Sequence, residues 1–532
     1  MARFFNTAGP IDQNDHYHLN SAERIDYDSV LSLIDQKKYF ILHAPRQSGK
    51  TSCLLALREM LNQSGNYHCV YINVEAAQAM RGRVRDAMTA ICRELASRLT
   101  SDLGIAPAED WARHALDSGG EALAFNIMLT TWAGRSDKPV VLFIDEVDSL
   151  IGDTLISLLR QIRSGYDKRP QNFPQSIVLC GVRDVRDVRD VRDYRIKQDG
   201  AEMITGGSAF NIKAESLRLR DFSVSDVKEL LNQHTQETGQ VFEPDALERV
   251  WYLTQGQPWL VNAIAYECCF RMKENLDRSR AVTLEMIDTA KENLIKNRET
   301  HIDQLIDKLR EDRVRRVIQP LLEGEMSLAS IPTDDLLYVE DLGLIHTQPQ
   351  TEISNPIYKE VIPRELTFTT QSGIPYQTAW YIGSDGSLLA KKLISEFQQF
   401  FRENSEVWLE RFDYKEAGQQ LLMQAFLQRV INGGGRIDRE YGLGRGRTDL
   451  YVKWPLSGGL SQKFVIELKI LRKSLDKTIS DGLKQTDEYA MRCGADEAHL
   501  LLFDRTPGKS WDEKIWCRTE IFQGRSIDIW GM

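Results

Sequence analysis

The feature that most constrains this chain is a strand–loop–helix pattern in the segment YFILHAPRQSGKTSCLLAL. An apolar run from Tyr39 to Leu42 leads into a short loop, and an apolar-periodic helix is expected to begin near Lys50. Such a loop offers backbone N–H groups and the positive end of a helix dipole to phosphate oxygens. The segment therefore predicts a nucleotide site, with Lys50 at the β- and γ-phosphates and Thr51 at Mg²⁺.

The loop departs from the pattern G-x-x-x-x-G-K-[ST] at its first position, where Ala44 replaces glycine. We expect alanine at this position to make the first turn of the loop less tight but to leave nucleotide binding possible. We expect the nucleotide to be bound by the whole loop and the first residues of the helix, namely Ala44, Pro45, Arg46, Gln47, Ser48, Gly49, Lys50, Thr51 and Ser52.

A second segment, KPVVLFIDEVDSL, predicts a buried parallel strand from Val140 to Ile144 that ends in two acids. Ligands of α/β sheets gather beyond the carboxyl ends of the strands, so these acids should face the loop. We expect Asp145 to hold Mg²⁺ together with Thr51, and Glu146 to orient the attacking water. The alternative is a pair of solvated acids after a core strand. The two segments together predict a parallel-sheet α/β ATPase core with ATP and Mg²⁺ as cofactors.

Further strand and arginine signals follow. The segment SIVLCGVRD predicts a buried strand from Ser176 to Cys180, whose polar end, Gly181 to Asp184, is a candidate sensor. Four copies of Val-Arg-Asp then run from Val182 to Asp193, and their period of three fits neither a helix face nor a strand face. We expect an exposed segment. An arginine finger could come from this repeat or from Arg160, Arg163 or Arg169, and the sequence does not choose among them.

The middle of the chain is predicted to be helical, with Ser223 as the N-cap of one helix and Gly256-Gln257-Pro258 interrupting another helical region. From His301 to Leu366, helices are followed by two short strands around a turn, which is the outline of a winged helix. This segment could contact DNA or serve as a docking module. Its basic residues are Arg310, Arg313, Arg315 and Arg316.

A second chemistry is indicated near the C-terminus. The segment GRTDLYVKWPLSGGLSQKFVIELKI predicts a hairpin with strands near Thr448 to Lys453 and from Lys463 to Ile470. Asp449 lies on the first strand, and Glu467 and Lys469 share one face of the second because they are two residues apart. Carboxylates on neighbouring strands can hold Mg²⁺, while an ammonium group steadies developing phosphate charge. A plain salt pair of Glu467 with Lys469 is the alternative.

This arrangement resembles the active site of PD-(D/E)xK phosphodiesterases, with Thr448 in place of the usual proline before the first acid. The resemblance implies metal binding by Asp449 and Glu467. A helix with the pattern Q-x-x-x-Y, here Gln485 and Tyr489, accompanies many members, and an additional acid often lies on the preceding helix. The implied catalytic residues are Glu416, Asp449, Glu467, Lys469 and Gln485.

Charge agrees with a local nucleic-acid site. The whole chain carries a net charge of −10, but residues 434–477 hold ten Lys and Arg against five Asp and Glu, a net charge of +5. Basic stretches of this kind bind phosphate backbones. DNA is therefore the expected partner of the C-terminal domain, although the sequence does not separate DNA from RNA.

The whole chain resembles a bacterial AAA-like ATPase family, similar to STAND and archaeal ATPases, whose members carry a C-terminal PD-(D/E)xK domain. HAPRQSGKT, LFIDEVDSL, GVRDVRDY and GQPWLVNA carry the first part of the resemblance, and AFLQRVINGGG, GRGRTDL and VIELK carry the second. It implies that Pro258 touches the adenine from the lid; the alternative is that Gly256-Gln257-Pro258 is an ordinary helix break without ligand contact. The implied domains are an ATPase core at 1–215, a helical lid at 216–300, a winged helix at 301–366, a linker at 367–386 and a restriction-endonuclease-like α/β domain at 387–532.

The leading hypothesis is an ATP-hydrolysing ATPase that controls a DNA endonuclease dependent on Mg²⁺ or Mn²⁺. Defence or mobile-element roles are suggested by association alone. The alternatives are a nucleotide-switched sensor that grips DNA without cutting it and a signalling scaffold. No apolar run is long enough to span a bilayer, and the eight cysteines lack metal-binding spacing. We therefore expect a cytoplasmic protein with reduced, mostly buried thiols and no membrane partner, and homo-oligomerisation stays open.

Overall fold

The computed structural model describes residues 3–182, 213–322, 331–366, 381–383, 385–411, 423, 426–427, 436–443, 446–456, 460–471, 474–504, 506 and 508–532. Glu416 and the valine-arginine-aspartate repeat beyond Val182 lie outside these residues. The chain divides into two compact units. Unit 1 comprises Met1–Leu305 and Pro332–Asn355, and unit 2 comprises Ile306–Ile331 and Pro356–Met532.

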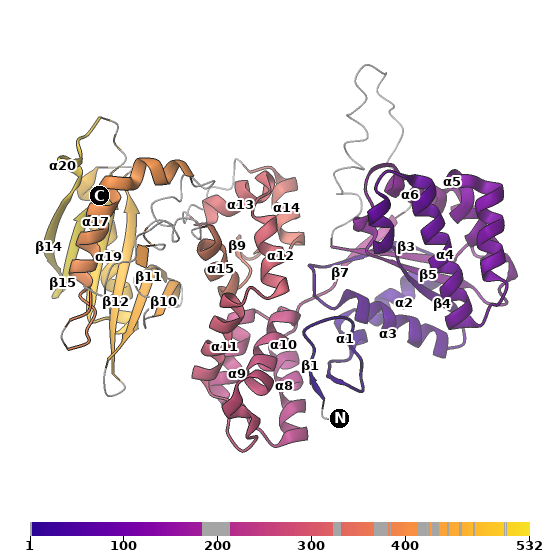
Figure 1. Ribbon diagram of the computed structural model, residues 1–532, viewed down its shortest axis with the longest axis horizontal. Coiled ribbons are helices and arrows are strands. Elements are labelled where there is room, and N and C mark those ends of the chain that lie inside the picture. Colours follow the sequence, from indigo (N-terminus) through magenta and orange to yellow (C-terminus); the bar gives the residue numbers. More distant parts are fainter. Residues whose placement is uncertain are drawn as a thin grey trace. The chain divides into compact units, whose positions relative to one another are not determined.

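Unit 1 is built on a five-stranded parallel sheet (Figure 1). The apolar runs of the sequence form its inner strands, because a strand covered on both faces needs apolar side chains on both. The predicted strands are confirmed, each extended by one residue at its carboxyl end. In spatial order the strands are β4 (His68–Asn73), β5 (Val140–Asp145), β6 (Ser176–Gly181), β3 (Tyr39–His43) and β7 (Lys213–Arg218).

Helices cover both faces of this sheet (Figure 1). One face packs against α2 (Tyr27–Asp35) and α3 (Lys50–Gln63), which follows the phosphate loop as predicted. The other face packs against three helices around the fully buried Trp132. These helices are α4 (Val84–Leu103), α5 (Ala108–Arg135) and α6 (Gly152–Ser164), and the short α1 (Ser21–Arg24) precedes α2.

The remaining part of unit 1 up to residue 299 is mainly helical. Ser223 caps the first helix as predicted, since its side chain accepts the Asp226 N–H. Gly256 has φ +79°, and a Cβ there would lie 2.0 Å from the Phe222 carbonyl oxygen, so only glycine suits this turn. The elements are β1 (Phe4–Phe5), β2 (His16–Tyr17), α8 (Val224–Thr238), α9 (Pro244–Thr254), α10 (Pro258–Tyr266) and α11 (Leu284–Lys296).

The segment predicted to be a winged helix contains helices followed by a short hairpin, as expected. Residues Pro332–Asn355 of this segment belong to unit 1. Its other described residues after Leu305 belong to unit 2. Its elements are α12 (Thr300–Lys308), α13 (Asp312–Leu322), α14 (Thr333–Asp341), β8 (Ile345–His346), β9 (Glu352–Ile353) and α15 (Pro356–Leu366).

Unit 2 carries a six-stranded mixed sheet in which the predicted hairpin pairs β11 with β12. β12 and β13 are parallel, as are β13 and β15, and the other neighbouring pairs are antiparallel. In spatial order the strands are β10 (Arg436–Leu443), β11 (Gly446–Pro455), β12 (Ser461–Ile470), β13 (Glu497–Phe503), β15 (Arg525–Gly531) and β14 (Trp516–Phe522).

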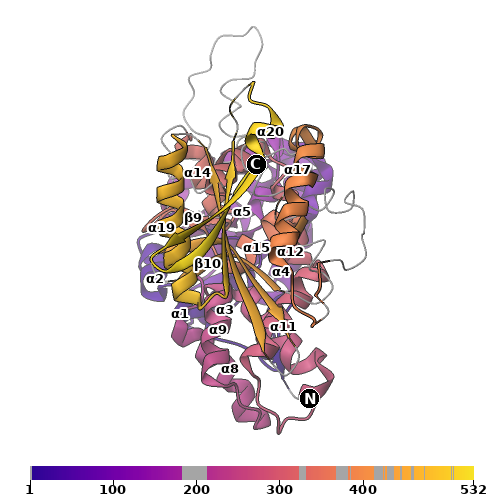
Figure 2. The ribbon, with the colours of Figure 1, turned by 90° about the vertical axis from the view of Figure 1, so that its left-hand side faces the viewer.

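Two long helices flank this sheet on opposite sides (Figure 2). Helix α19 (Leu475–Cys493) packs its apolar face on Val465, Leu500 and Leu502. Helix α17 (Ala390–Arg411) covers the other face, where Phe401 meets the ring of Phe503 at a centroid distance of 5.3 Å. A short α20 (Trp511–Lys514) precedes β14.

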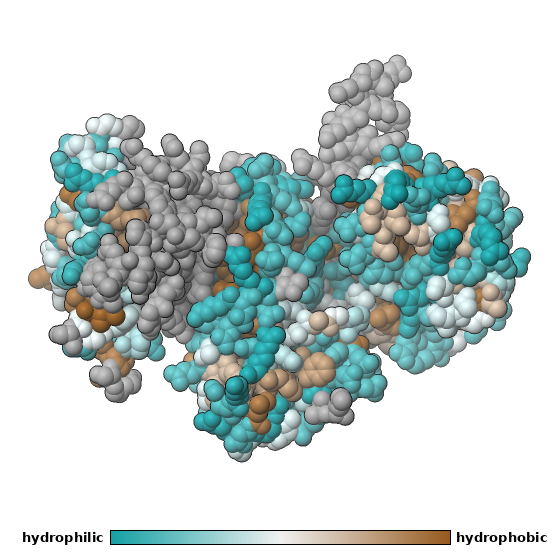
Figure 3. Space-filling model, in the orientation of Figure 1, coloured by the Kyte–Doolittle hydropathy of each residue, from teal (hydrophilic) through white to brown (hydrophobic). Residues whose placement is uncertain are grey.

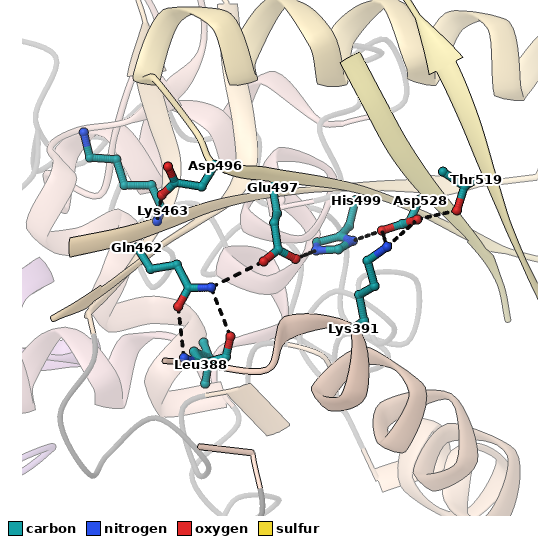
Figure 4. A network of polar contacts seen from close by, with 9 residues as sticks. All are labelled: Leu388, Lys391, Gln462, Lys463, Asp496, Glu497, His499, Thr519 and Asp528. Atoms are coloured by element: carbon teal, nitrogen blue, oxygen red, sulfur yellow. Dashed lines mark hydrogen bonds and ion pairs between the residues drawn. The ribbon is translucent and has the colours of Figure 1, made fainter. Parts of the chain in front are cut away.

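A polar network joins α17 to the sheet (Figure 4). The Lys391 Nζ lies 2.9 Å from the Asp528 Oδ2, and the Thr519 hydroxyl donates to the Asp528 Oδ1 across 2.6 Å. The fully buried His499 stands between Glu497 and Asp528, with each ring nitrogen 3.6 Å from a carboxylate oxygen. The network fixes the position of α17 on the face opposite to α19.

The polarity of the surface and the state of the cysteines are as expected from the sequence. The face seen in Figure 3 is mostly hydrophilic where the structure is described. Six of the eight cysteines are buried and all eight are free thiols, as predicted. None of the helices in the described ranges has the length and apolar character needed to cross a membrane.

Candidate functional site

A cavity of about 340 Å³ lies in unit 1 at the phosphate loop. Its walls come from several stretches that are far apart in the sequence, among them the N-terminal residues 6–11, the phosphate loop and the acids Glu75 and Glu146. Helix α10 contributes Pro258, Trp259 and Asn262, and Phe222 and Gln304 also line the cavity. This volume is within the range of small-molecule sites.

The phosphate loop has the backbone of a nest for anions. Gly49, the N-cap of α3, has φ +89°, and Gln47 has φ +56°. Lys50 is only 5% exposed, and its ammonium donates to the carbonyl oxygens of Ala44 and Pro45, each at 3.0 Å. Nucleotide phosphates at the start of α3 can replace these carbonyls as acceptors, since the helix N-terminus attracts negative charge.

Thr51 and Asp145, the two residues expected to hold Mg²⁺, are in direct contact. The Thr51 hydroxyl donates to the Asp145 Oδ2 across 2.7 Å. Asp145 is fully buried and also accepts hydrogen bonds from the Tyr71 hydroxyl at 2.9 Å and from the Glu146 N–H at 2.9 Å. A hydroxyl and a carboxylate at one point are ligands that a hard cation such as Mg²⁺ prefers, so the residues present suit that ion.

Glu146 follows directly in a left-handed conformation, φ +56°, and lines the cavity. Burial raises the pKa of its carboxyl group; the attraction of Lys50 lowers it, and the negative charges of Asp145 and Asp148 raise it further. A carboxylate with a raised pKa in a cavity has the properties of a general base.

The predicted sensor segment begins at Gly181, between the phosphate loop and the acidic segment that follows β5. β6 pairs with both β3 and β5, and its last residue, Gly181, accepts the Ala44 N–H at 3.3 Å. A Cβ on Gly181 would lie 2.6 Å from the Asp148 Oδ1, and the Val182 N–H donates to the Asp148 Oδ2 at 3.1 Å. The strand end therefore connects the loop with the acidic segment. Arg183 and Asp184 lie outside the described residues.

The N-terminal segment was not expected at the cavity. The Ile11 N–H donates to the Ser52 hydroxyl at 3.0 Å, and the Trp259 indole donates to the Thr7 carbonyl at 2.9 Å. Residues 6–11 are thereby fastened to α3 at one end and to α10 at the other. Pro258, expected at the adenine, also lines the cavity.

Arg24 also lines the cavity without having been predicted. It is 7% exposed, it stacks on the Phe222 ring at 4.8 Å, and it donates to the Arg220 carbonyl at 2.7 Å. No carboxylate of the described chain forms an ion pair with it, and burial lowers the pKa of its guanidinium. An anion bound at Gly49 would neutralise this charge, because a Cβ there would lie 2.8 Å from the Arg24 Nη1.

The three arginine-finger candidates that the structure describes do not line the cavity of their own chain. Arg160 and Arg163 are exposed on α6. Arg169 packs over Tyr39, the first residue of β3, at 5.0 Å. This position is at the end of the strand opposite to the phosphate loop.

In unit 2, β12 presents the predicted E-x-K pair. Glu467 is 2% exposed, and the Lys469 Nζ lies 2.7 Å from its Oε1. Both belong to the face covered by α19, which carries Gln485 and the buried Tyr489. Leu450 of β11 pairs with Ile466, so the register places Asp449 opposite Glu467. The side chain of Asp449 lies outside the described residues, and the described side chains alone include no metal-binding group of three His, Cys, Asp or Glu.

Comparisons with known proteins support the first part of this description. Residues 34–188 match the model of a protein family described as an AAA domain. This range includes the phosphate loop, the acids of β5 and the end of β6. No curated protein matches the sequence.

Three solved structures match parts of this chain at low sequence identity. A Walker-type ATPase of Pyrococcus abyssi is 17% identical, with 67% of this chain and 99% of that chain covered and a TM-score of 0.44. RuvB of Thermotoga maritima, a Holliday junction branch migration motor, is 16% identical, with coverages of 64% and 94% and a TM-score of 0.33. Domain III of the replication initiation protein DnaA of Thermotoga maritima is 14% identical, with coverages of 54% and 98% and a TM-score of 0.31. Similarity at this level carries no conclusion about function. The AAA-family match and the geometry of the loop together identify residues 34–188 as an AAA-type P-loop ATPase domain whose ligand is ATP.

Proposed function

We propose that this chain is an ATP-regulated, Mg²⁺-dependent DNA endonuclease, in which the AAA-type domain controls a phosphodiester-cleaving site in unit 2. The observation that carries the nuclease assignment is the β11–β12 register. It sets Asp449 opposite Glu467, and Lys469 lies two residues farther along the same face. The proposed domain division is the one expected from the sequence, with the nuclease domain at 387–532.

At the proposed nuclease site, Asp449 and Glu467 would hold Mg²⁺ through carboxylate oxygens. A bound Mg²⁺ supplies a nucleophilic water and stabilises charge on the phosphate. The Lys469 ammonium, now paired with Glu467 at 2.7 Å, is close enough to stabilise negative charge on a phosphate at the same place. Glu416 and Gln485 would complete the acid and amide groups around the site.

At the ATPase site, Lys50 would bind the β- and γ-phosphates, and Thr51 with Asp145 would hold Mg²⁺. Glu146, which lines the cavity, would orient the attacking water. The pKa of its carboxylate is raised by burial, which would help it to accept a proton from that water. Pro258, at the first turn of α10, would contact the adenine. The net charge of +5 in residues 434–477 supports DNA as the partner of the second unit.

Plasmid cleavage tests the nuclease proposal. Supercoiled plasmid is incubated with the full chain, ATP and either Mg²⁺ or Mn²⁺, and nicked and linear products are measured. Glu467→Gln and Asp449→Asn should each reduce cleavage at least about 100-fold, since each removes a metal-binding carboxylate. Glu520→Gln on the edge strand β14 is the matched control and should retain cleavage. Equal cleavage by Glu467→Gln and wild type would overturn the assignment.

A nucleotide-switched protein that binds DNA without cutting it is the second candidate. The 2.7 Å ion pair between Glu467 and Lys469 favours it, because such a pair also satisfies both charges without a metal. DNA binding that depends on ATP, with no product in Mg²⁺ or Mn²⁺, would select this candidate.

A further inference from the structure

Gln47 of the phosphate loop forms a hydrogen bond with His301 of helix α12. The Nδ1 atom of His301 lies 2.6 Å from the Gln47 Oε1, although the two residues are 254 positions apart. The His301 ring also stacks on Trp259, with a centroid distance of 4.9 Å and an interplanar angle of 21°. His301 thus joins the loop to lid helix α10.

This contact holds a residue whose backbone is strained. Gln47 has φ +56°, a conformation that is unfavourable for a residue other than glycine and persists where the surroundings hold it. The Oε1 atom can only accept a hydrogen bond, so the facing Nδ1 of His301 donates. Burial lowers the pKa of His301 to about 4, so the ring is neutral at neutral pH, and its one proton lies on Nδ1.

Helix α12 also reaches the cavity one turn later. Gln304, three residues after His301 and hence on the same helix face, lines the cavity. The helix continues to Lys308, whereas the first segment of unit 1 ends at Leu305 and unit 2 begins at Ile306. One continuous helix therefore contacts the nucleotide cavity in its first half and belongs to the second unit in its last residues.

We propose that His301 is a positioning residue of the ATPase site that anchors Gln47 in the phosphate loop and, through α12, transmits the nucleotide state to the start of unit 2. This inference rests on nucleotide binding at the cavity but not on nuclease activity. When phosphates draw Lys50 away from the loop carbonyls, the loop adjusts. The His301–Gln47 bond passes this adjustment to α12, because a helix moves as a rigid body.

Two substitutions separate the functions of the His301 ring. His301→Phe keeps an aromatic ring for stacking on Trp259 but removes the donor. His301→Asn keeps a donor but removes the stack. Gln47→Met removes the acceptor from the other side. The exposed His114 on α5 provides the matched control, His114→Phe.

Hydrogen exchange of residues 306–322 with and without ATP, together with ATP turnover, tests the proposal. Wild type and His114→Phe should both show an ATP-dependent change in exchange at α13. His301→Phe and Gln47→Met should lose it and should each turn over ATP about tenfold more slowly, the effect of one lost hydrogen bond in a buried site. His301→Asn should retain part of the ATP-dependent exchange change and part of the ATP turnover that His301→Phe loses. The double variant with His301→Phe and Gln47→Met should turn over ATP no more slowly than either single variant.

The outcomes separate this inference from the ATPase assignment. Failure of wild type to bind ATP would refute nucleotide binding itself. ATP binding by wild type without any exchange change at 306–322, or an unchanged response in His301→Phe, would refute the transmission through His301 while leaving the ATPase assignment intact. Additive losses in the double variant would likewise refute the direct contact.

Discussion

The hydroxyl of Thr51 donates to the carboxylate of Asp145 across 2.7 Å, although the two residues are 94 positions apart. Thr51 lies in the first turn of α3 and Asp145 ends β5, and β6 separates β5 from β3 in the sheet. The contact therefore spans the end of an intervening strand. It brings together the two oxygen donors that the sequence suggested for Mg²⁺, next to the cavity that Thr51 lines.

Thr51→Val should weaken Mg²⁺-dependent ATP binding about tenfold or more, because it removes a metal-binding hydroxyl and leaves the buried Asp145 with one donor fewer. Thr51→Ser keeps the hydroxyl and should remain near wild type. Titration with a fluorescent ATP analogue, with Mg²⁺ and with EDTA, measures the effect. Equal Mg²⁺ dependence in Thr51→Val and Thr51→Ser would contradict the assignment.

Glu146→Gln should abolish ATP turnover while retaining ATP binding. In wild type, turnover should fall as the pH drops through a pKa that burial raises above that of an ordinary glutamate, since the base must be ionised. The same raised pKa means that the folded state binds a proton more tightly than the unfolded state. Ionised Glu146 therefore destabilises the fold at neutral pH, and this cost disappears below the ordinary glutamate pKa.

Melting temperatures of wild type and Glu146→Gln at pH 7 and pH 4 test the stability part. The variant should melt higher at pH 7, and the difference should shrink at pH 4. A lower melting temperature of the variant at pH 7 would show that Glu146 stabilises the fold instead.

Arg24→Met should decrease the affinity for ATP about tenfold, while the nucleotide-free protein should remain close to wild type in stability. The reason is that the buried guanidinium forms no ion pair with a described carboxylate. Burial disfavours its charge, and the charges of Asp221 and Asp226 offset that cost only in part, so the pKa of Arg24 is lowered. Thermal shifts with and without ATP check both effects. Strong destabilisation of the nucleotide-free variant with an unchanged ATP-induced shift would assign Arg24 a purely structural role.

Asp528→Asn should destabilise unit 2 by about 1–3 kcal/mol, because Lys391 loses its ion pair and His499 loses one of its two carboxylates. Burial raises the pKa of Asp528, but the hydrogen bonds from Thr519 and Lys391 outweigh it, and the net pKa is lowered. The carboxylate therefore stabilises the fold above the ordinary aspartate pKa, and this contribution is lost as the pH falls through the lowered value.

Urea denaturation of Asp528→Asn and wild type at pH 7 and pH 3 measures this contribution. The difference between the two proteins should be larger at pH 7 than at pH 3. Lys392→Met, on the solvent side of α17 next to Lys391, serves as the control. If the difference in unfolding free energy between the two proteins did not depend on pH, the charge of Asp528 would not account for the destabilisation.

Much of unit 1 could be predicted because its signals are local. The phosphate loop is one contiguous segment, and apolar runs such as Val140 to Ile144 form strands wherever both faces are covered. The Gly-Gln-Pro sequence at 256–258 predicts an interruption of the helix locally, although the close approach of the Phe222 carbonyl to Gly256 is a tertiary contact that the sequence does not show. The E-x-K pair could be placed on a strand for the same reason.

The parts that could not be predicted depend on contacts between distant segments. Arg24 meets Phe222, and Trp259 meets Thr7, with no periodicity in the sequence that points to either contact. The His301–Gln47 bond depends on where α12 packs, which neither helix propensity nor hydrophobic pattern specifies. His499, an isolated histidine on a strand, offers no sign that two carboxylates from β13 and β15 will surround it.

The most direct test of the central claim, that ATP controls cleavage by the second unit, is plasmid cleavage in Mg²⁺ measured with ATP, with ADP and without nucleotide. The cleavage rate should change at least about tenfold between ATP and no nucleotide in wild type, a coupling of about 1.4 kcal/mol. This difference should vanish in Lys50→Ala, and Glu467→Gln should cut under none of the conditions. Cleavage that ignores nucleotide in wild type, or persists in Glu467→Gln, would contradict the account.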